Sequence, residues 1–577
     1  MSKQPQALQI TLGQYSTAGV KPENQDFHGA IVPTGASLHL KGVAIALADG
    51  ISSSAVGAEA AQTAVGSFLS DYYATPDSWS VRQSATRVIN AANGWLHGRN
   101  ISSLNPDKNA GLVCTFDALV LKGREAHIFH AGDARVYAVH SGSAEQLTED
   151  HRIPAEDGGS YLARGLGIQR KLDIDYRSVP LSVGDIFTLS TDGLHDFIRP
   201  DRIAGIIAAA DTLDAAAKEA VTQALAAGSD DNLTLQIVRV EHLPDASSSE
   251  ALLEVQSLPA APQLSAGDTL DGFRIIRQLH ASSRSQVLLA CDGQDRQVIL
   301  KVPSTELRGN AQHINSFLLE EWVASRLRSD HLMQAAPRST PATALYVAMS
   351  YVEGQTLRAW MADNPTPDLT AFRSIIGQII AGLRAMHRKQ MLHQDLRPEN
   401  IMIDREGTVK IIDFGAVHIP GVAEAAPGVA DFIPGTFQYT APEYLSGDMV
   451  SWRSDQFALG VIAYELLTGH LPYGTAVAKV SSPTDQRRLT YTHARTYAKD
   501  IPLWLDAALR KAVQPDPVQR YDALSEFLAD ISAGKPNIAG SRRYVPLVER
   551  NPTAFWQSVA AFFALSTAIL AYLHFSA

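Results

Sequence analysis

The chain has 577 residues, more than a single hydrophobic core accommodates, so several domains are expected. Its 45% hydrophobic and 19% charged residues exclude an intrinsically disordered chain. The formal net charge of −11 argues against a nucleic-acid partner, because such a partner requires a basic surface.

Cysteine usage excludes two further classes of protein. Cys114 and Cys291 lie far apart, each inside an apolar run and outside any CxxC pattern. A disulfide framework and a thiolate zinc site are therefore excluded, and we expect two buried free thiols.

The first half of the chain combines apolar runs with helical segments. Three apolar runs that carry an aspartate at one end predict strands: residues 41–50, 184–193 and 228–238. Three segments with helical periodicity predict helices: residues 55–73, 80–98 and 211–228. Because strands and separate helices mix without regular alternation, we expect an α+β domain with a layered sheet core.

Aspartates at these strand ends predict metal chemistry. Asp49 and Asp192 each end a strand and precede a glycine, and Asp231 comes just before a strand. Several carboxylates brought to one crevice make an all-oxygen site suited to Mg²⁺ or Mn²⁺. Two such ions could activate a water for attack on phosphorus.

Residues 7–241 resemble the metal-dependent protein phosphatases of the 2C (PPM) type. The resemblance is carried by six segments: KPENQD (21–26), LADG (47–50), HAGDARVY (130–137), LTEDH (147–151), STDGLHD (190–196) and GSDDNLT (228–234). It implies a layered β-sandwich flanked by helices that hydrolyses phosphoserine and phosphothreonine with two or three metal ions. The metal residues that it implies are Asp26, Asp49, Gly50, Asp133, Asp192 and Asp231, with Asp133 assigned to a third ion.

Two departures from the phosphatase pattern concern the catalytic centre. Lys21 takes the place of the phosphate-binding arginine, so it offers a point charge instead of a bidentate fork. Gln25 stands where many members carry a metal-side glutamate. Neither departure removes a core metal aspartate, so we expect an active phosphatase.

A change of composition marks the next boundary. Residues 242–267 are rich in Ser, Ala, Pro and Leu without a sustained period, which predicts an inter-domain linker. The following segment predicts strands that lead to Lys301, and residues 314–329 predict a helix.

The stretch HQDLRPENIMIDREGTVKIIDFG (393–415) carries phosphoryl-transfer chemistry. Asp395 could orient an attacking hydroxyl group, while Asn400 and Asp413 could hold Mg²⁺ against nucleotide phosphates. A chance loop would not carry Asp, Asn and Asp-Phe-Gly in this order.

Residues 268–533 resemble protein kinases, which implies a bilobal fold that binds ATP with Mg²⁺. The resemblance makes Asp395, Lys301 and Asn400 catalytic, Asn400 and Asp413 metal ligands, and Glu320 the partner of Lys301, with Glu321 as the alternative. It places Met349, Tyr351 and Val352 at the adenine. It also implies that Asp455 supports the catalytic loop and that Arg520 pairs with Glu443. The three glycines of the phosphate-binding turn are replaced by His280, Ser282 and Ser285.

Two features concern regulation. Gln394 replaces the arginine with which many kinases bind a phosphate on the activation loop. Residues 416–434 contain no Ser, Thr or Tyr, and the first hydroxyl after them is Thr436. We therefore expect a kinase that is held on, or controlled through the linker and the membrane, without activation-loop phosphorylation.

The C-terminal region predicts a membrane anchor. Residues 555–573 contain no charged residue and could cross a hydrocarbon layer of roughly 30 Å. We expect a juxtamembrane segment over 534–553, with basic residues that favour the cytoplasmic side, and a transmembrane helix over 554–574. The alternative is a buried helix of the last domain. No secretory signal opens the sequence, so the catalytic domains are expected in the cytoplasm at the inner (plasma) membrane.

Together these patterns predict a membrane-anchored bifunctional enzyme. Its kinase would transfer the γ-phosphoryl group of ATP to protein Ser or Thr, and its phosphatase would reverse such modifications on phosphoprotein substrates, including the chain itself. One alternative is an active phosphatase joined to a pseudokinase that senses nucleotide or docks substrate, as the missing glycines suggest. A membrane scaffold without either activity is the third interpretation.

Overall fold

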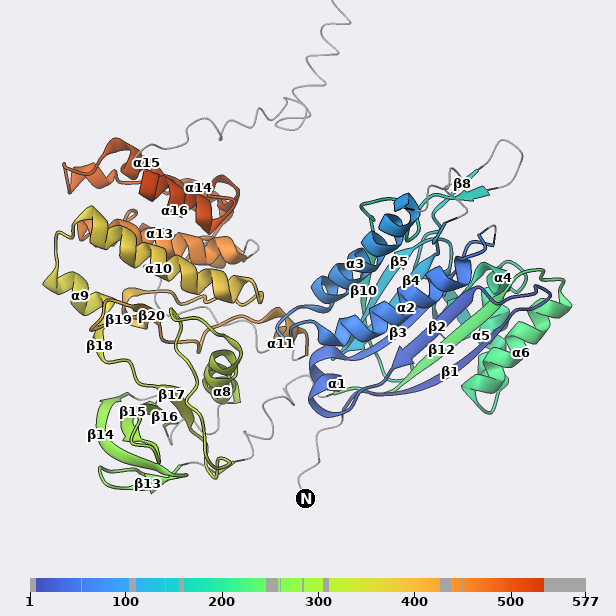
Figure 1. Cartoon of the computed structure of the whole chain (residues 1–577), viewed down its shortest axis with the longest axis horizontal. Coiled ribbons are helices and arrows are strands. Elements are labelled where there is room, and N and C mark those ends of the chain that lie inside the picture. The colour runs from blue at the N-terminus through green and yellow to red at the C-terminus, as the bar shows by residue number, and fades with distance from the viewer. Residues whose placement is uncertain are drawn as a thin grey trace, which may run out of the picture.

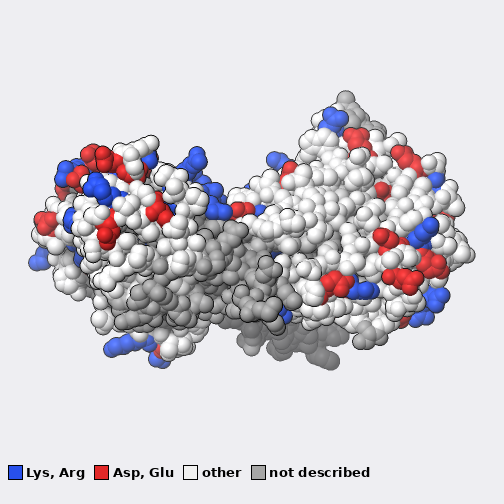
Figure 2. Space-filling view, turned by 90° about the horizontal axis from the view of Figure 1, so that it is seen from below, with Lys and Arg blue, Asp and Glu red and all other residues white. Residues whose placement is uncertain are grey.

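The structure is a computed structural model that describes residues 7–533, except 53, 103–110, 141, 155–159, 245–257, 260, 283–284, 305–310, 426–437 and 448–449. Two bodies make up this part of the chain, an N-terminal domain rich in strands and a C-terminal domain with a small sheet and a larger helical region (Figure 1). On the face in Figure 2, acidic and basic side chains are interspersed over both bodies.

Two five-stranded antiparallel sheets form the centre of the N-terminal domain. The first has the order β1 (Gln9–Thr17), β12 (Leu233–His242), β11 (Ile186–Ser190), β6 (Arg135–His140), β7 (Ser143–Gln146). The second has the order β10 (Asp175–Pro180), β5 (Glu125–Ala131), β4 (Phe116–Lys122), β3 (Val43–Asp49), β2 (Asp26–Ile31). This is the sandwich that the sequence predicts.

The sequence of β3 explains how the layers are held together. Its residues are apolar on both faces because the strand is covered on both sides. Val43, Ile45 and Leu47 pack in the cluster between the two sheets, while Ala44, Ala46 and Ala48 pack against helices. The helices on that side are α2 (Gly57–Ala74) and α3 (Val81–Ser102).

Helices also cover the outer face of the first sheet. They are α4 (Asp192–His195), α5 (Pro200–Ala209) and α6 (Leu213–Ala226). Smaller elements complete the domain: α1 (Gly35–Lys41), β8 (Arg152–Pro154) and β9 (Ser160–Leu162). The three helices predicted in this half are thus α2, α3 and α6, and Cys114 and Cys291 are both buried and free as expected.

The C-terminal domain has two lobes. The small lobe contains the sheet β13 (Thr269–Leu270), β14 (Phe273–Ala281), β15 (Ser285–Cys291), β16 (Gln297–Pro303), β17 (Val347–Ser350), and the helix α8 (Ala311–Arg326). The larger lobe contains a three-stranded sheet and most of the helices: β18 (Gly354–Thr356), β19 (Ile401–Asp404), β20 (Val409–Ile411), α9 (Leu357–Asp363), α10 (Leu369–His387), α11 (Pro420–Ala425), α12 (Glu443–Ser446), α13 (Trp452–Thr468), α14 (Pro483–Arg487), α15 (Leu503–Ala512) and α16 (Leu524–Ala533). Short 3₁₀ helices are η2 (Pro398–Asn400), η3 (Ala476–Lys479), η4 (Ala494–Thr496) and η5 (Pro517–Gln519).

Helix α10 anchors the larger lobe. Asp368 caps its first turn by accepting hydrogen bonds from the backbone N–H groups of Thr370 and Ala371. Its buried stripe contains Ile375, Ile376, Ile379, Ile380, Leu383 and Met386 at helical spacing. The helix thereby delivers the chain to His393 at the start of the phosphoryl-transfer stretch.

Within the described residues, no helix is long and apolar enough to cross a membrane. The predicted juxtamembrane segment 534–553 and transmembrane helix 554–574 lie outside the described residues, as does most of the predicted linker 242–267.

Candidate active sites

The two sheets of the N-terminal domain bring the predicted aspartates to one edge. Asp26 begins β2 and lies opposite Asp49, the last residue of β3. Asp192 starts α4 directly after β11, and Asp231 lies two residues before β12. The hydroxyl groups of Thr191 and Thr234 donate hydrogen bonds to Asp26 Oδ2, at 2.9 and 2.7 Å, and so tie the second sheet to the first at this edge.

Electrostatics at this edge favour a bound cation. Burial raises the pKa of Asp26 to about 7 and the pKa of Asp192 to about 6. Burial also raises the pKa of Asp49, and the neighbouring carboxylates of Asp26, Asp192, Asp133 and Asp231 raise it further. Carboxylates that repel one another in this way are stabilised in their charged forms by a cation.

Two basic side chains contact the cluster. Lys21 Nζ lies 2.6 Å from Asp231 Oδ1 and 2.7 Å from Ser52 Oγ. Arg152 donates from Nε to Asp133 Oδ2 at 2.6 Å and from Nη2 to Asp192 Oδ2 at 2.8 Å. Sequence reasoning predicted Lys21 at this site but missed Arg152, whose only signal is its position directly after the LTEDH segment.

The residues present fit a divalent cation. As the side chains stand, no three His, Cys, Asp or Glu residues of the described chain converge closely enough to hold an ion. Three of the predicted carboxylates, Asp133, Asp192 and Asp231, instead contact Arg152 or Lys21. The other oxygen of Asp192, Oδ1, is buried without a hydrogen-bond partner among the described residues, and such an acceptor is suited to a metal.

Gly50 is required by the backbone at this edge. A Cβ at this position would lie 2.4 Å from the carbonyl carbon of Gly57, too close for any side chain. The glycine next to Asp49 therefore follows from close packing as well as from the predicted role of its carbonyl group.

In the C-terminal domain, Lys301 of β16 meets Glu320 of α8. Lys301 Nζ lies 2.5 Å from Glu320 Oε1, so Glu320 is the partner of the lysine. The alternative, Glu321, instead accepts a hydrogen bond from Arg338 Nη2 at 2.5 Å. Burial would lower the pKa of Lys301, but the carboxylates of Glu320 and Asp413 raise it above its ordinary value, so the lysine is charged.

Asp455 supports the start of the loop that begins at His393. Its carboxylate accepts hydrogen bonds from the backbone N–H groups of His393 at 2.9 Å and Gln394 at 3.0 Å. Gln394 adopts a φ of 63°, a left-handed conformation that these bonds stabilise. Asp455 thus has the supporting contacts expected of it.

Asp395 and Asn400 lie together at the end of this loop. Asn400 Nδ2 donates to the backbone oxygen of Asp395 at 2.8 Å and to its Oδ2 at 3.0 Å. Burial raises the pKa of Asp395. Burial would also raise the pKa of Asp413, but Lys301 and the N–H of Gly415 lower it below its ordinary value. Asp413 is therefore a charged carboxylate, the form that binds a metal ion.

Hydrogen bonds join Ser282 and Ser285, which flank residues 283–284 between β14 and β15. The backbone N–H of Ser282 donates to the carbonyl oxygen of Ser285 at 3.0 Å, and the N–H of Ser285 donates to Ser282 Oγ at 3.2 Å. A turn that carries glycines would keep such backbone donors available for phosphates.

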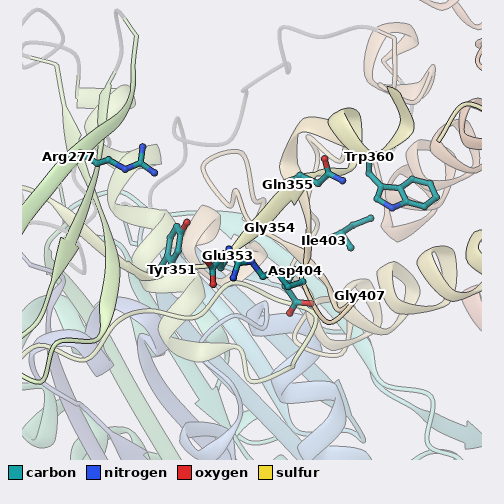
Figure 3. A pocket seen from close by; sticks show the side chains of 10 residues that line it. Arg277, Tyr351, Glu353, Gly354, Gln355, Trp360, Ile403, Asp404 and Gly407 are labelled. Atoms are coloured by element: carbon teal, nitrogen blue, oxygen red, sulfur yellow. Dashed lines mark ion pairs between the residues drawn. The ribbon is translucent and has the colours of Figure 1, made fainter. Parts of the chain in front are cut away.

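The segment between the lobes borders a cavity of about 720 Å³. Figure 3 shows the side chains that line it, among them Arg277, Tyr351, Glu353, Gln355 and Trp360. Tyr351 comes from the predicted adenine-binding set. Two other members of that set, Met349 and Val352, are buried in the core of the domain instead of facing this cavity.

A buried ion pair joins α12 to the residue that follows η5. The guanidinium of Arg520 makes two hydrogen bonds of 2.7 Å to the carboxylate oxygens of Glu443, and both side chains are fully buried. This is the pairing that the sequence predicts.

The folds and sites define a phosphatase-like domain followed by a protein kinase domain. Comparison with protein-family models agrees, since residues 15–227 match protein phosphatase 2C and residues 273–529 match the protein kinase domain. Residues 15–227 therefore belong to the protein phosphatase 2C family and residues 273–529 to the protein kinase family, so the chain is a fusion of a phosphatase domain and a kinase domain.

Curated relatives match the kinase half. The serine/threonine-protein kinase PrkC of Bacillus subtilis is 28% identical over 260 residues, which is 45% of this chain and 40% of PrkC. PknL of Mycobacterium tuberculosis is 31% identical over 252 residues, 44% of this chain and 62% of PknL. The chain thus spans less than two thirds of the length of these relatives.

Solved structures match the phosphatase half. A serine/threonine phosphatase of S. agalactiae is 23% identical, with 40% of this chain and all of that chain covered and a TM-score of 0.35. The catalytic domain of the phosphatase PstP in complex with two manganese ions is 21% identical, with 41% of this chain and all of that chain covered and a TM-score of 0.35.

Proposed function

We propose that this chain is a membrane-anchored bifunctional enzyme that both phosphorylates and dephosphorylates protein serine and threonine. The observation that carries the proposal is the coexistence of two sets of charged groups in one chain. One is the Lys301–Glu320 ion pair beside Asp413, and the other is Asp49 with the four aspartates around it.

The kinase half is suited to phosphoryl transfer. Lys301, held by Glu320, presents a charged ammonium group for nucleotide phosphates, and Asp413 and Asn400 supply oxygen ligands for Mg²⁺. Mg·ATP, when bound, supplies the phosphoryl group. Asp395 would orient the attacking hydroxyl group of a protein substrate, with its position fixed by Asn400.

The phosphatase half is suited to hydrolysis of phosphate esters. Divalent cations, either Mg²⁺ or Mn²⁺, held by Asp49, Asp192 and Asp231 would supply Lewis-acid activation of water. Lys21 and Arg152 lie where they could bind phosphate oxygens once the cations share the carboxylates. The substrates would be phosphoproteins, including this chain.

Labelling with radioactive ATP tests both halves in the purified full chain. If both centres work, Asp192→Asn accumulates label because the phosphatase is disabled, and the double variant Asp192→Asn/Asp395→Asn carries none. Asp522→Asn, an exposed aspartate paired with Arg453, is the matched control and should behave as wild type. Mn²⁺-dependent hydrolysis of a phosphopeptide, abolished by Asp192→Asn, tests the phosphatase by itself.

A second candidate is an active phosphatase with a nucleotide-sensing or docking pseudokinase. The hydrogen bonds between Ser282 and Ser285 favour it, because they occupy backbone N–H groups that could otherwise bind phosphates. Absence of label in Asp192→Asn, together with measurable ATP binding, would establish this alternative over the bifunctional enzyme.

The membrane anchor is supported by the uncharged run at 555–573 and the arginines before it. The kinase and phosphatase would then face the cytoplasm at the inner (plasma) membrane. Fractionation after carbonate extraction tests this: the full chain should stay with membranes, and a chain truncated after residue 553 should be released.

A further inference from the structure

The segment after the Asp-Phe-Gly motif lies against the phosphatase domain. Helix α11, which begins five residues after Gly415, sits between the two bodies next to α1 (Figure 1). Two regions of the phosphatase domain contact it: the end of β4 with the turn that joins β4 and β5, and the loop 75–80 between α2 and α3. We call this loop the docking loop.

Lys122, at the end of β4, makes the central contact. Its Nζ donates to the carbonyl oxygen of Gly421 at 2.6 Å and lies 3.1 Å from Glu424 Oε2. The side chain is 1% exposed, although a lysine at a strand end normally reaches into water. A buried ammonium group of this kind is costly unless it is paired, and both of these contacts come from α11.

Glu424 is held from a second direction. Its carboxylate oxygen Oε2 accepts a hydrogen bond of 2.9 Å from the backbone N–H of Val81, the first residue of α3. The negative charge therefore lies both at the positive end of a 22-residue helix and beside Lys122.

Gly421 fits the docking loop so closely that a side chain is excluded. Its N–H donates to the carbonyl oxygen of Ser78 at 3.1 Å. A Cβ at this position would lie 2.4 Å from the carbonyl oxygen of Asp77 and 2.6 Å from that of Trp79. The fit is backbone against backbone, so it has little freedom to adjust.

The docking loop also contacts two other elements that shape the kinase site. Asp77 pairs with Arg326 at 3.5 Å, and Arg326 is the last residue of α8, the helix that carries Glu320. Trp79 Nε1 donates to the carbonyl oxygen of Arg388 at 3.4 Å, just after the helix α10 that leads into the catalytic loop. One loop of the phosphatase domain thus contacts three segments of the kinase domain: α8, the residue after α10, and α11.

Two contacts around the kinase centre are formed in this docked state. Lys301 and Glu320 are in contact, and His418 pairs with Leu392 next to the catalytic loop through backbone hydrogen bonds of 2.8 and 3.0 Å. In many kinases a phosphate bound by an arginine orders this segment, but here that arginine is Gln394. The docking contacts supply order that a phosphate would otherwise provide.

We propose that the phosphatase domain positions the activation segment of the kinase, with Lys122 as the positioning residue that holds α11 through Gly421 and Glu424. The kinase is then switched on by fusion to a folded phosphatase domain and needs no phosphate on its own segment. This inference rests on the proposed kinase function.

Two variants of the full chain test the role. Lys122→Met keeps the length of the side chain and removes its charge, and Gly421→Ala places a methyl group against the docking loop. Their matched controls are Lys218→Met, at an exposed position of α6, and Gly66→Ala, where a Cβ meets no atom within 4 Å. Each protein is assayed for kcat and KM with casein and ATP, and for hydrolysis of p-nitrophenyl phosphate with Mn²⁺.

Both test variants should lose at least tenfold in kinase kcat while KM for ATP stays within about twofold, and phosphatase turnover should remain as in wild type. Amide hydrogen exchange of residues 416–425 should be slow in wild type and in both controls, and fast in Lys122→Met and Gly421→Ala. A contact that only stabilises the fold would lower the phosphatase and kinase activities together.

Unchanged kinase kcat in variants whose 416–425 amides exchange fast would overturn the proposal, as would an increase in kcat. A wild-type chain without transfer activity would overturn the proposed kinase function and this role with it. That outcome is distinguishable from failure of the contact, because slow exchange of 416–425 would persist. Equal exchange in wild type and Gly421→Ala would show that the contact itself is wrong.

Discussion

Glu320 and Glu321 are adjacent on α8, yet only Glu320 lies against Lys301, at 2.5 Å, while Glu321 pairs with Arg338. The ammonium group is thereby held for nucleotide phosphates by one carboxylate and not by its neighbour. Glu320→Gln should lower kinase kcat about 10- to 100-fold, because a preorganised charge is lost from the site. Glu321→Gln is the matched control and should stay within about threefold of wild type in a steady-state assay. Equal losses in the two variants would contradict the assignment.

Arg152 competes with metal ions for Asp192 and Asp133. Its guanidinium is about two-thirds buried, with a side-chain exposure of 29%. Replacement by glutamine should tighten Mn²⁺ binding by up to about fivefold, since a partly exposed ion pair contributes up to about 1 kcal/mol. Titration calorimetry of Arg152→Gln against wild type measures this, with Arg177→Gln, which removes an exposed pair with Glu145, as the control. Weaker Mn²⁺ binding in Arg152→Gln would show that the arginine supports the metal site instead.

Buried histidines should make the phosphatase domain sensitive to acid. Burial lowers the pKa of His195 to about 3 and the pKa of His127 to about 4, so both are neutral in the folded domain near pH 7. Below about pH 6.5 these histidines bind protons in the unfolded chain but not in the folded domain. The free energy of unfolding therefore falls as the pH falls from about 6.5 towards the pKa values in the folded domain. At pH 5 each histidine should lower the free energy of unfolding by up to about 2 kcal/mol relative to neutral pH.

Urea unfolding of the full chain at pH 7.5 and at pH 5, followed through the phosphatase transition, measures this loss. His195→Gln should reduce the difference between the two pH values. A difference that His195→Gln leaves unchanged would rule out His195 as one of its sources.

The buried pair of Arg520 and Glu443 should dominate the stability of the larger kinase lobe. Glu443→Gln leaves a buried guanidinium group without its charge partner, and it should lower the free energy of unfolding by about 3–5 kcal/mol. Asp522→Asn removes the partner of Arg453 at the surface, where the carboxylate is 71% exposed, and should cost less than about 1 kcal/mol. The midpoint of denaturation of the kinase domain distinguishes them. Similar shifts in the two variants would contradict the burial argument.

Local patterns were sufficient to predict much of this molecule. Asp49 and Asp192 were predicted to share a site because each ends an apolar run, and the two sheets indeed bring them to one edge. The choice of Glu320 over Glu321 followed from its place in the kinase pattern. In each case the relevant signal lies within a few residues of the side chain concerned.

The features that were missed depend on contacts between distant segments. Lys122 resembles any lysine at a strand end, and only the approach of α11 buries it. Arg152 follows a recognisable segment, but the contact of its side chain with Asp192 depends on how β8 and β9 pair. The pattern of apolar residues cannot specify how one domain packs on another, because the polar contacts that decide it have no period.

The strand β3 sets the distance between the two chemistries. It starts two residues after α1, which faces the kinase, and it ends at Asp49, so its seven residues separate the kinase contact from the metal carboxylates by roughly 20 Å. On the proposed function, a phosphate placed on a substrate by the kinase would have to move by at least about this length before it reached the metal carboxylates.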